Sequence, residues 1–147
     1  MQEDLKLSNQ LCFPIYALSR QITALYRPHL DKLKLTYPQY LVLLVLWEHS
    51  TITVKRLGEL LWLDSGTLTP LLKRMESNGL LKRKRSQTDE RLVDIIITDK
   101  GAELEKKASK IPDAIRKALE TKDIQLVKLR EQLKDLMKIA GRCDENL

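Results

Sequence analysis

Two short segments with apolar residues at helical spacing lie side by side in the middle of the chain, and each follows a good N-cap residue. Thr53 caps the first segment, and Asp64 is the favoured cap of the second, which ends at Gly79 in a left-handed conformation. Pro70 also suits the first position of a helix, so a later start stays open. A short helix, a turn and a second helix are therefore expected, and this order constrains the fold more than any other feature.

The residue pattern changes after the second helix. Leu80–Arg85 and Arg91–Ile97 are candidates for extended strands, the second being rich in β-branched residues, and a polar connection separates them. This is a β-hairpin with a charged tip. Two helices followed by a basic hairpin are the order of a winged helix-turn-helix, which we assign to residues 36–98. The expected fold class is mainly α with a small β-hairpin wing.

A long first helix is expected before this region. Residues 5–33 carry an apolar stripe of helical period, so the helix would begin near Leu5. Pro14 means that either the first turns are separate or the helix bends there. Thr36 then caps another helix, which ends near Ser50.

Helices are also expected after the hairpin. In residues 99–143, Thr98 caps one helix, Pro112 interrupts or bends it, and a last helix starts near Thr121. The first and last helices carry more apolar surface than one winged helix can cover, so we interpret residues 5–33 and 99–143 as dimerisation helices of a single 147-residue chain. The alternative is a bundle of these helices within one chain.

Positive charge is concentrated on the second helix and the hairpin. The whole chain carries a net charge of +6, with a pI near 9.3. Lys73 to Arg91 hold seven basic and three acidic residues, a net +4. A basic stripe on a helix and hairpin of this order is typical of binding to a polyanion.

Double-stranded DNA is the expected partner, with the second helix in the major groove and the hairpin tip at a neighbouring minor groove. The candidate contacts on the helix are Ser65, Thr67, Thr69, Lys73 and Arg74. Arg83 and Arg85 are expected to neutralise phosphates along the wing. The other interpretation is a solvated surface over an ordinary core, but charge, element order and hairpin coincide here.

Several other classes are disfavoured. The chain has no apolar run near the ~18 residues of a membrane span and no signal-peptide pattern, so a cytoplasmic location with reduced thiols is expected. His29 and His49 belong to no catalytic motif, and Cys12 and Cys143 are too distant in sequence to suggest a metal site. We expect no enzyme activity, no metal and no cofactor.

The sequence resembles the MarR family of bacterial transcription regulators, and within it the thiol-based peroxide sensors of the OhrR and MgrA type. The resemblance is carried by four segments: Leu63–Glu76, Arg85–Arg91, Gln10–Phe13 and Leu35–Gln39. It implies a symmetric homodimer that binds a pseudo-palindromic operator as a repressor. It also assigns to Asp89 the role of orienting Arg91 for the minor groove.

The resemblance further implies that Cys12 is the redox-sensing residue, assisted by the hydroxyls of Tyr16, Tyr26 and Tyr37, two of them from the other subunit. An organic hydroperoxide or other oxidant would convert the thiolate to sulfenic acid, and then to a disulfide or a mixed disulfide with a low-molecular-weight thiol. The altered dimer interface would move the winged helices apart and release the operator. From periodicity alone, these residues are ordinary packing residues.

Cys143 follows Gly141 in a segment that we expect to be a frayed tail, and we interpret it as incidental to sensing. Two alternatives in other classes stay open. One is a MarR-type repressor that is released by a small aromatic ligand, with Cys12 only lining the pocket. The other is a purely structural helical dimer.

Overall fold

A computed structural model describes residues 3–86, 89, 91–121 and 124–144. The chain divides into two compact units, Met1–Ile111 and Pro112–Leu147. Among the described residues, no helix has the length and apolar character needed to cross a membrane.

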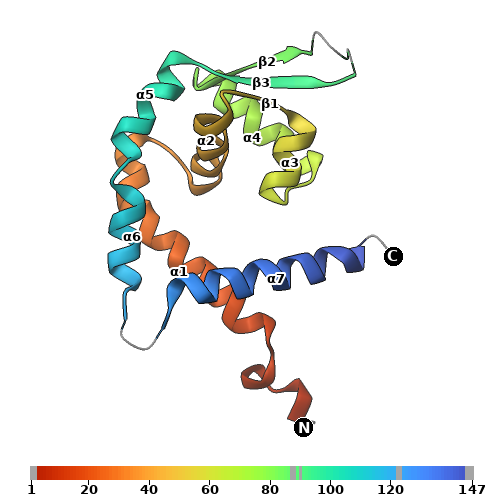
Figure 1. The fold of residues 1–147 in the computed structure, drawn as a ribbon, viewed down its shortest axis with the longest axis vertical. Coiled ribbons are helices and arrows are strands. Elements are labelled where there is room, and N and C mark those ends of the chain that lie inside the picture. The colour runs from red at the N-terminus through yellow and green to blue at the C-terminus, as the bar shows by residue number, and fades with distance from the viewer. Residues whose placement is uncertain (1–2, 87–88, 90, 122–123, 145–147) are drawn as a thin grey trace. The chain divides into compact units, whose positions relative to one another are not determined.

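The first unit holds helices and a small sheet (Figure 1). It also contains most of the buried residues. Its elements are α1 (Cys12–Leu30), α2 (Tyr37–His49), β1 (Thr51–Thr53), α3 (Val54–Leu61), α4 (Ser65–Ser77), β2 (Leu81–Arg85), β3 (Val93–Ile97) and α5 (Asp99–Ala108). The helix α6 (Ile111–Leu119) begins at its end, and α7 (Leu126–Asp144) belongs to the second unit. The fold class predicted from the sequence, mainly α with a small wing, is confirmed.

The helices α3 and α4 form where their caps predict. Thr53 Oγ1 accepts the N–H of Arg56 at 3.1 Å, and α3 begins at the next residue. Asp64 caps α4, so the helix starts before Pro70 rather than at it. Gly79 is left-handed, with φ of 71°, and stops the helix as predicted.

The wing is part of a three-stranded antiparallel sheet of order β1-β3-β2. Thr51 pairs with Ile96, and Arg83 pairs with Ile95 on the other side of β3. The sequence predicted only the β2–β3 hairpin. It missed β1 because this strand is three residues long, and its last residue, Thr53, also serves as a helix cap.

The first helix is shorter than predicted. It begins at Cys12, and two separate 3₁₀ turns, Glu3–Leu5 and Leu7–Asn9, precede it. Pro14 lies in the first turn, where its missing N–H leaves no hydrogen bond unmade. The sequence left open whether the first turns are separate or the helix bends at Pro14, and the structure shows separate first turns.

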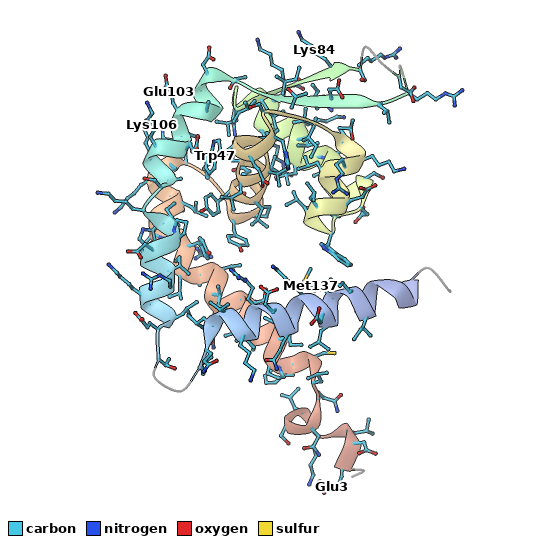
Figure 2. All side chains as sticks on the ribbon, viewed as in Figure 1. Glu3, Trp47, Lys84, Glu103, Lys106 and Met137 are labelled. Carbon is cyan, nitrogen blue, oxygen red and sulfur yellow. The ribbon has the colours of Figure 1, made fainter. Side chains whose placement is uncertain are left out.

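The core of the first unit lies where α2, α3 and α4 meet β3. Its fully buried side chains include Leu43, Leu46, Leu57, Leu72, Met75 and Ile95. Trp47 of α2 donates its indole N–H to the carbonyl of Gly101 in α5 at 2.9 Å (Figure 2). A Cβ on Gly101 would lie 2.2 Å from the carbonyl oxygen of Leu80, so only glycine lets α5 approach this closely.

The helices after the wing differ from the prediction mainly at their ends. Pro112 is the second residue of α6, so the predicted interruption is confirmed. The last helix begins at Leu126 rather than near Thr121, and it continues through Gly141 to Asp144. The expectation that Cys143 lies in a frayed tail is therefore wrong. A glycine inside a helix costs only about 1 kcal/mol, which is too little to end it.

Candidate DNA interface and redox site

The first turn of α4 is held by one carboxylate. Asp64 accepts the N–H of Thr67 at 2.9 Å and the hydroxyl of Thr67 at 2.8 Å. These hydrogen bonds lower the pKa of Asp64, and the one from the Thr67 hydroxyl has the larger effect, followed by the one from the main chain. The Thr67 hydroxyl therefore donates inward to the cap, and its oxygen lone pairs stay available to a donor outside.

One side of α4 is buried and the other is open. Leu68, Leu72 and Met75 face the core of the first unit. The predicted DNA-contacting residues Ser65, Thr67, Thr69, Lys73 and Arg74 are all exposed. The structure therefore places all five on the solvent side of one helix, as entry into a major groove requires.

The end of α4 is fixed to the start of α5. The Thr98 hydroxyl donates to the carbonyl of Gly79 at 2.7 Å, and the Lys100 ammonium donates to the carbonyl of Asn78 at 2.6 Å. These carbonyls have no partner inside the helix, so the two contacts stabilise its C-terminal end.

The base of the wing is joined to α4 by a two-point contact. Glu76 Oε1 accepts the main-chain N–H of Arg83 at 2.9 Å, and Glu76 Oε2 accepts its Nε–H at 2.8 Å. The side chains are 35% and 29% exposed, which makes this the least exposed ion pair among the described residues. The hydrogen bond from the Arg83 side chain is the main cause that lowers the pKa of Glu76. Sequence reasoning assigned Arg83 to phosphates and missed Glu76.

The other basic side chains of the wing face solvent. Lys82, Lys84 and Arg85 are exposed, and Lys84 projects outward from β2 (Figure 2). At the tip, the Asp89 carboxylate accepts the main-chain N–H of Arg91 at 2.9 Å. The guanidinium of Arg91 has no partner within the described part of the chain. Asp89 thus fixes the backbone from which Arg91 projects.

Cys12 is the first residue of α1 and is exposed. Tyr16 lies one turn later on the same side of the helix. Arg20, a further turn on, donates to the Tyr16 hydroxyl at 3.3 Å and lies 5.6 Å from its ring centroid. Sequence reasoning missed Arg20, although its spacing of four residues from Tyr16 could have indicated the contact.

Tyr26 and Tyr37 lie together, far along α1 from Cys12. Their ring centroids are 4.8 Å apart, and Tyr40 lies 5.9 Å from Tyr26. Burial raises the pKa of Tyr26, and burial followed by repulsion from Tyr26 raises the pKa of Tyr37, so both are neutral hydroxyl donors. Tyr26 lies fourteen positions after Cys12 on α1, about 21 Å along the helix axis. Within one chain, the structure brings the two tyrosines together but not to the cysteine.

A groove of about 750 Å³ runs along α1, and its lining includes Phe13, Tyr16, Arg20, Arg27, Leu35 and Tyr37. Other apolar side chains of α1 also remain uncovered, among them Ile15 and Leu18. In the second unit, α7 exposes Val127, Leu136, Met137 and Ile139. Each terminal helix thus has an apolar face that its own unit does not cover.

The short helix α3, a turn and the exposed helix α4, followed by the basic β2–β3 wing, are the elements of a winged helix-turn-helix. This arrangement is typical of a winged-helix transcriptional regulator. Residues 24–111 match the family model described as transcriptional regulator SarA/Rot. The chain is 62% identical over 113 residues to an organic hydroperoxide resistance transcriptional regulator of Bacillus subtilis (strain 168), covering 77% of each chain. It is 38% identical over 143 residues to the HTH-type transcriptional regulator MgrA of Staphylococcus aureus, covering 97% of this chain and 92% of the other.

A solved structure of reduced AbfR bound to DNA has the same fold, with a TM-score of 0.80, 37% identity and 97% of both chains covered. The chain belongs to the MarR family of transcriptional regulators, in the group of the SarA/Rot and hydroperoxide-resistance regulators. The resemblance found in the sequence is thereby confirmed.

Proposed function

We propose that this protein is a homodimeric repressor that binds operator DNA and releases it when an organic hydroperoxide oxidises Cys12. The observation that carries the proposal is the separation of Cys12, at the start of α1, from Tyr26 near the end of α1 and its ring partner Tyr37 at the start of α2. Because of this separation, the proposed sensor is complete only in a dimer. Operator DNA lies in the cytoplasm, which is where such a repressor works. The role needs no enzyme turnover and no cofactor.

The DNA contacts are proposed from the exposed side chains of α4 and the wing. Ser65, Thr67 and Thr69 offer hydroxyls near the N-terminal end of α4, and Lys73 and Arg74 offer charge farther along. Arg91 reaches the minor groove from a backbone that Asp89 holds, and Arg85 contacts phosphate along the wing. Two copies in a symmetric dimer read two half-sites, so the operator is a pseudo-palindrome.

The dimer is proposed from the uncovered apolar faces of α1 and α7. A two-fold axis that crosses α1 midway between Cys12 and Tyr26 places the Cys12 of each subunit against the partner subunit's Tyr26 and Tyr37. Tyr16, one turn from Cys12 on the same helix, is the third proposed donor to this sulfur, and its hydroxyl would turn from Arg20 to reach it. Phenol hydroxyls that donate to the sulfur stabilise the thiolate, which is the form that reacts with peroxides.

In the proposed reaction, the Cys12 thiolate attacks the distal oxygen of the hydroperoxide and the O–O bond breaks. The sulfur is oxidised to sulfenic acid, and the peroxide is reduced to an alkoxide, which takes up a proton from water and leaves as the alcohol. A low-molecular-weight thiol then condenses with the sulfenic acid, which forms an S–S bond and releases water. The added group occupies the space between the α1 helices, and the two winged helices lose the spacing of the half-sites.

The proposal is tested by gel shifts at several controlled salt concentrations on the promoter region upstream of the protein's own gene, with and without cumene hydroperoxide and with free cysteine as the low-molecular-weight thiol. We expect the wild type and Cys143→Ser to bind and to be released by the oxidant. Cys12→Ser should bind equally well and stay bound. Release of Cys12→Ser by cumene hydroperoxide contradicts the sensing role, and absence of salt-dependent binding by the reduced wild type contradicts the DNA-binding role.

The groove along α1 favours one second candidate, a repressor released by a small aromatic ligand. Its lining combines aromatic rings with the guanidinium groups of Arg20 and Arg27, which suits an aromatic anion. A gel shift with salicylate as the probe distinguishes the two candidate functions. Release of Cys12→Ser by salicylate supports the ligand-binding repressor, and release that needs both oxidant and Cys12 supports the sensor.

A further inference from the structure

The wing is attached to α4 through the carboxylate of Glu76, a residue to which no DNA contact was assigned above, and its partner is Arg83, which the sequence assigned to phosphates. Glu76 lies in the last turns of α4, and its two oxygens bind two different groups of Arg83 in β2. One of these groups is the main-chain N–H and the other is the side-chain Nε–H. The contact therefore fixes both the strand and the arginine side chain. We refer to these two residues as the Glu76–Arg83 clamp.

The position of Arg83 in the strand makes the clamp a control point for the wing. Strand residues alternate between the two faces, so Arg83 turns toward α4 while Lys82 and Lys84 turn outward. Ser86, where the hairpin leaves the sheet, lies three positions after Arg83, a span of about 10 Å. A small rotation of the strand at Arg83 is therefore amplified at Arg91, which lies beyond that point.

We propose that Glu76 is a positioning residue for operator binding, and that the Glu76–Arg83 clamp sets the angle between the major-groove helix and the minor-groove wing. This inference rests on the proposed DNA-binding function and deepens it. Arg83 acts chiefly through Glu76 and the geometry of the wing, and Arg91 makes the groove contact.

The clamp predicts an effect opposite to that of simple electrostatics. Glu76→Gln removes a negative charge from a surface that meets phosphates, so charge alone would make DNA binding tighter. A glutamine amide cannot accept both hydrogen bonds in the arrangement seen here, because one end of it is a donor. One of the two hydrogen bonds is therefore lost, which loosens the hold of α4 on the wing. We expect Glu76→Gln to bind the operator about tenfold more weakly, the scale of one lost charge-assisted hydrogen bond.

Matched controls come from the outer face of the same sheet. Lys84 and Asp94 are directly opposite each other in the β2–β3 register. Asp94→Asn removes the same charge as Glu76→Gln without touching the clamp, so its binding should be unchanged or tighter.

The second residue of the clamp gives an independent variant. Arg83→Lys keeps the positive charge but lacks the Nε–H, so it should weaken binding about as much as Glu76→Gln. The double variant should be no weaker than either single variant, because both remove one interaction.

The experiment measures affinity by fluorescence anisotropy on the promoter duplex at several salt concentrations, using the full reduced chain and checking the folding of each variant by thermal melting. Hydroxyl-radical footprinting then reports the minor-groove protection given by the wing. Methylation of guanine N7 by dimethyl sulfate reports the major-groove protection given by α4. We expect Glu76→Gln to lose the minor-groove protection and to keep the major-groove protection. Because Arg83→Lys leaves the hydrogen bond from the Arg83 main chain to Glu76 possible, it tests the clamp even if Glu76→Gln folds poorly.

Suppose that the wild type binds the duplex and responds to oxidant. If Glu76→Gln then binds as tightly as the wild type or more tightly, with the full footprint, the clamp is overturned. Failure of the reduced wild type to bind the duplex instead overturns the proposed function, and the clamp with it. Retained release of Glu76→Gln by cumene hydroperoxide is the expected result, because the clamp joins α4 to β2, whereas Cys12 is the first residue of α1.

Discussion

Tyr26 of α1 and Tyr37 of α2 pack with their ring centroids 4.8 Å apart and their planes tilted by 60°. Each ring supports the other, so either hydroxyl can be removed without removing the packing. The proposed sensor requires these hydroxyls at the sulfur of the partner subunit's Cys12.

Tyr26→Phe should therefore slow the oxidation of Cys12 by cumene hydroperoxide by about tenfold, the effect of one lost hydrogen bond to a charged group. Its melting temperature should stay close to that of the wild type, because the ring remains. Stopped-flow oxidation followed by intact-mass analysis measures the rate. Tyr40→Phe is the matched control, since Tyr40 belongs to the same ring cluster but is not a proposed sensor residue. Equal rates for Tyr26→Phe and the wild type contradict the role of this hydroxyl.

The hydrogen bonds from Thr67 to the Asp64 carboxylate predict a pH dependence of stability. Because the folded state lowers the pKa of Asp64, its contribution is complete above the ordinary aspartate pKa of about 3.9 and is lost as the pH falls through the lowered value. Asp64→Ala should melt at a lower temperature than the wild type at neutral pH, and the difference should shrink in acid. Asp64→Asn keeps an acceptor for the Thr67 N–H and should melt closer to the wild type. A constant difference between Asp64→Ala and the wild type across this pH range would count against the cap.

At the wing tip, the Asp89 carboxylate accepts the main-chain N–H of Arg91. Variants of the two residues therefore distinguish the positioning role of Asp89 from the charge that Arg91 brings to the DNA. Both Asp89→Ala and Arg91→Ala should weaken operator binding about tenfold. Only Arg91→Ala should also reduce the dependence of affinity on salt, because it removes a cation that meets the DNA. Asp89→Asn, which can still accept the N–H, is the control and should bind nearly as well as the wild type. Near-native affinity of both alanine variants in gel shifts at controlled salt rejects the assignment.

The close approach of α5 to the end of α4 predicts a large loss of stability for Gly101→Ala. The new methyl group would meet the main-chain carbonyl of Leu80, which cannot move aside as a side chain can. We expect the free energy of unfolding to fall by about 3 kcal/mol or more. Urea denaturation measures this loss. Ala102→Ser, at the exposed neighbouring position, should change it by no more than about 0.5 kcal/mol. An unchanged urea midpoint for Gly101→Ala would rule out the close packing.

Local signals in the sequence predicted local structure well. The helices α3 and α4 start directly after Thr53 and Asp64, because a side chain that binds the first free N–H groups marks a helix end without help from the rest of the fold. Pro112 and Gly79 act in the same local way. Gly141 did not end its helix, because a glycine only permits a helix to stop and does not force it to.

Contacts between elements were not predictable from these signals. The strand β1 exists because β3 offers it a free edge, and the residues Thr51–Thr53 alone do not reveal that edge. The exposed residues of α4 followed from helical periodicity, whereas the pairing of Glu76 with Arg83 depends on how closely β2 returns to α4. The sensor residues came from resemblance, because nothing in the spacing of Cys12, Tyr26 and Tyr37 shows that they belong to one site.

The place of β3 in the middle of the sheet has a consequence for how this protein can change over evolutionary time. A two-stranded hairpin is marginally stable by itself, but here β1 holds the far edge of β3 and anchors the wing from outside the hairpin. The loop that joins β2 to β3 can therefore gain, lose or exchange residues without loosening the fold. Substitutions in that loop can therefore change the operator preference without requiring changes in the helices that form the proposed dimer.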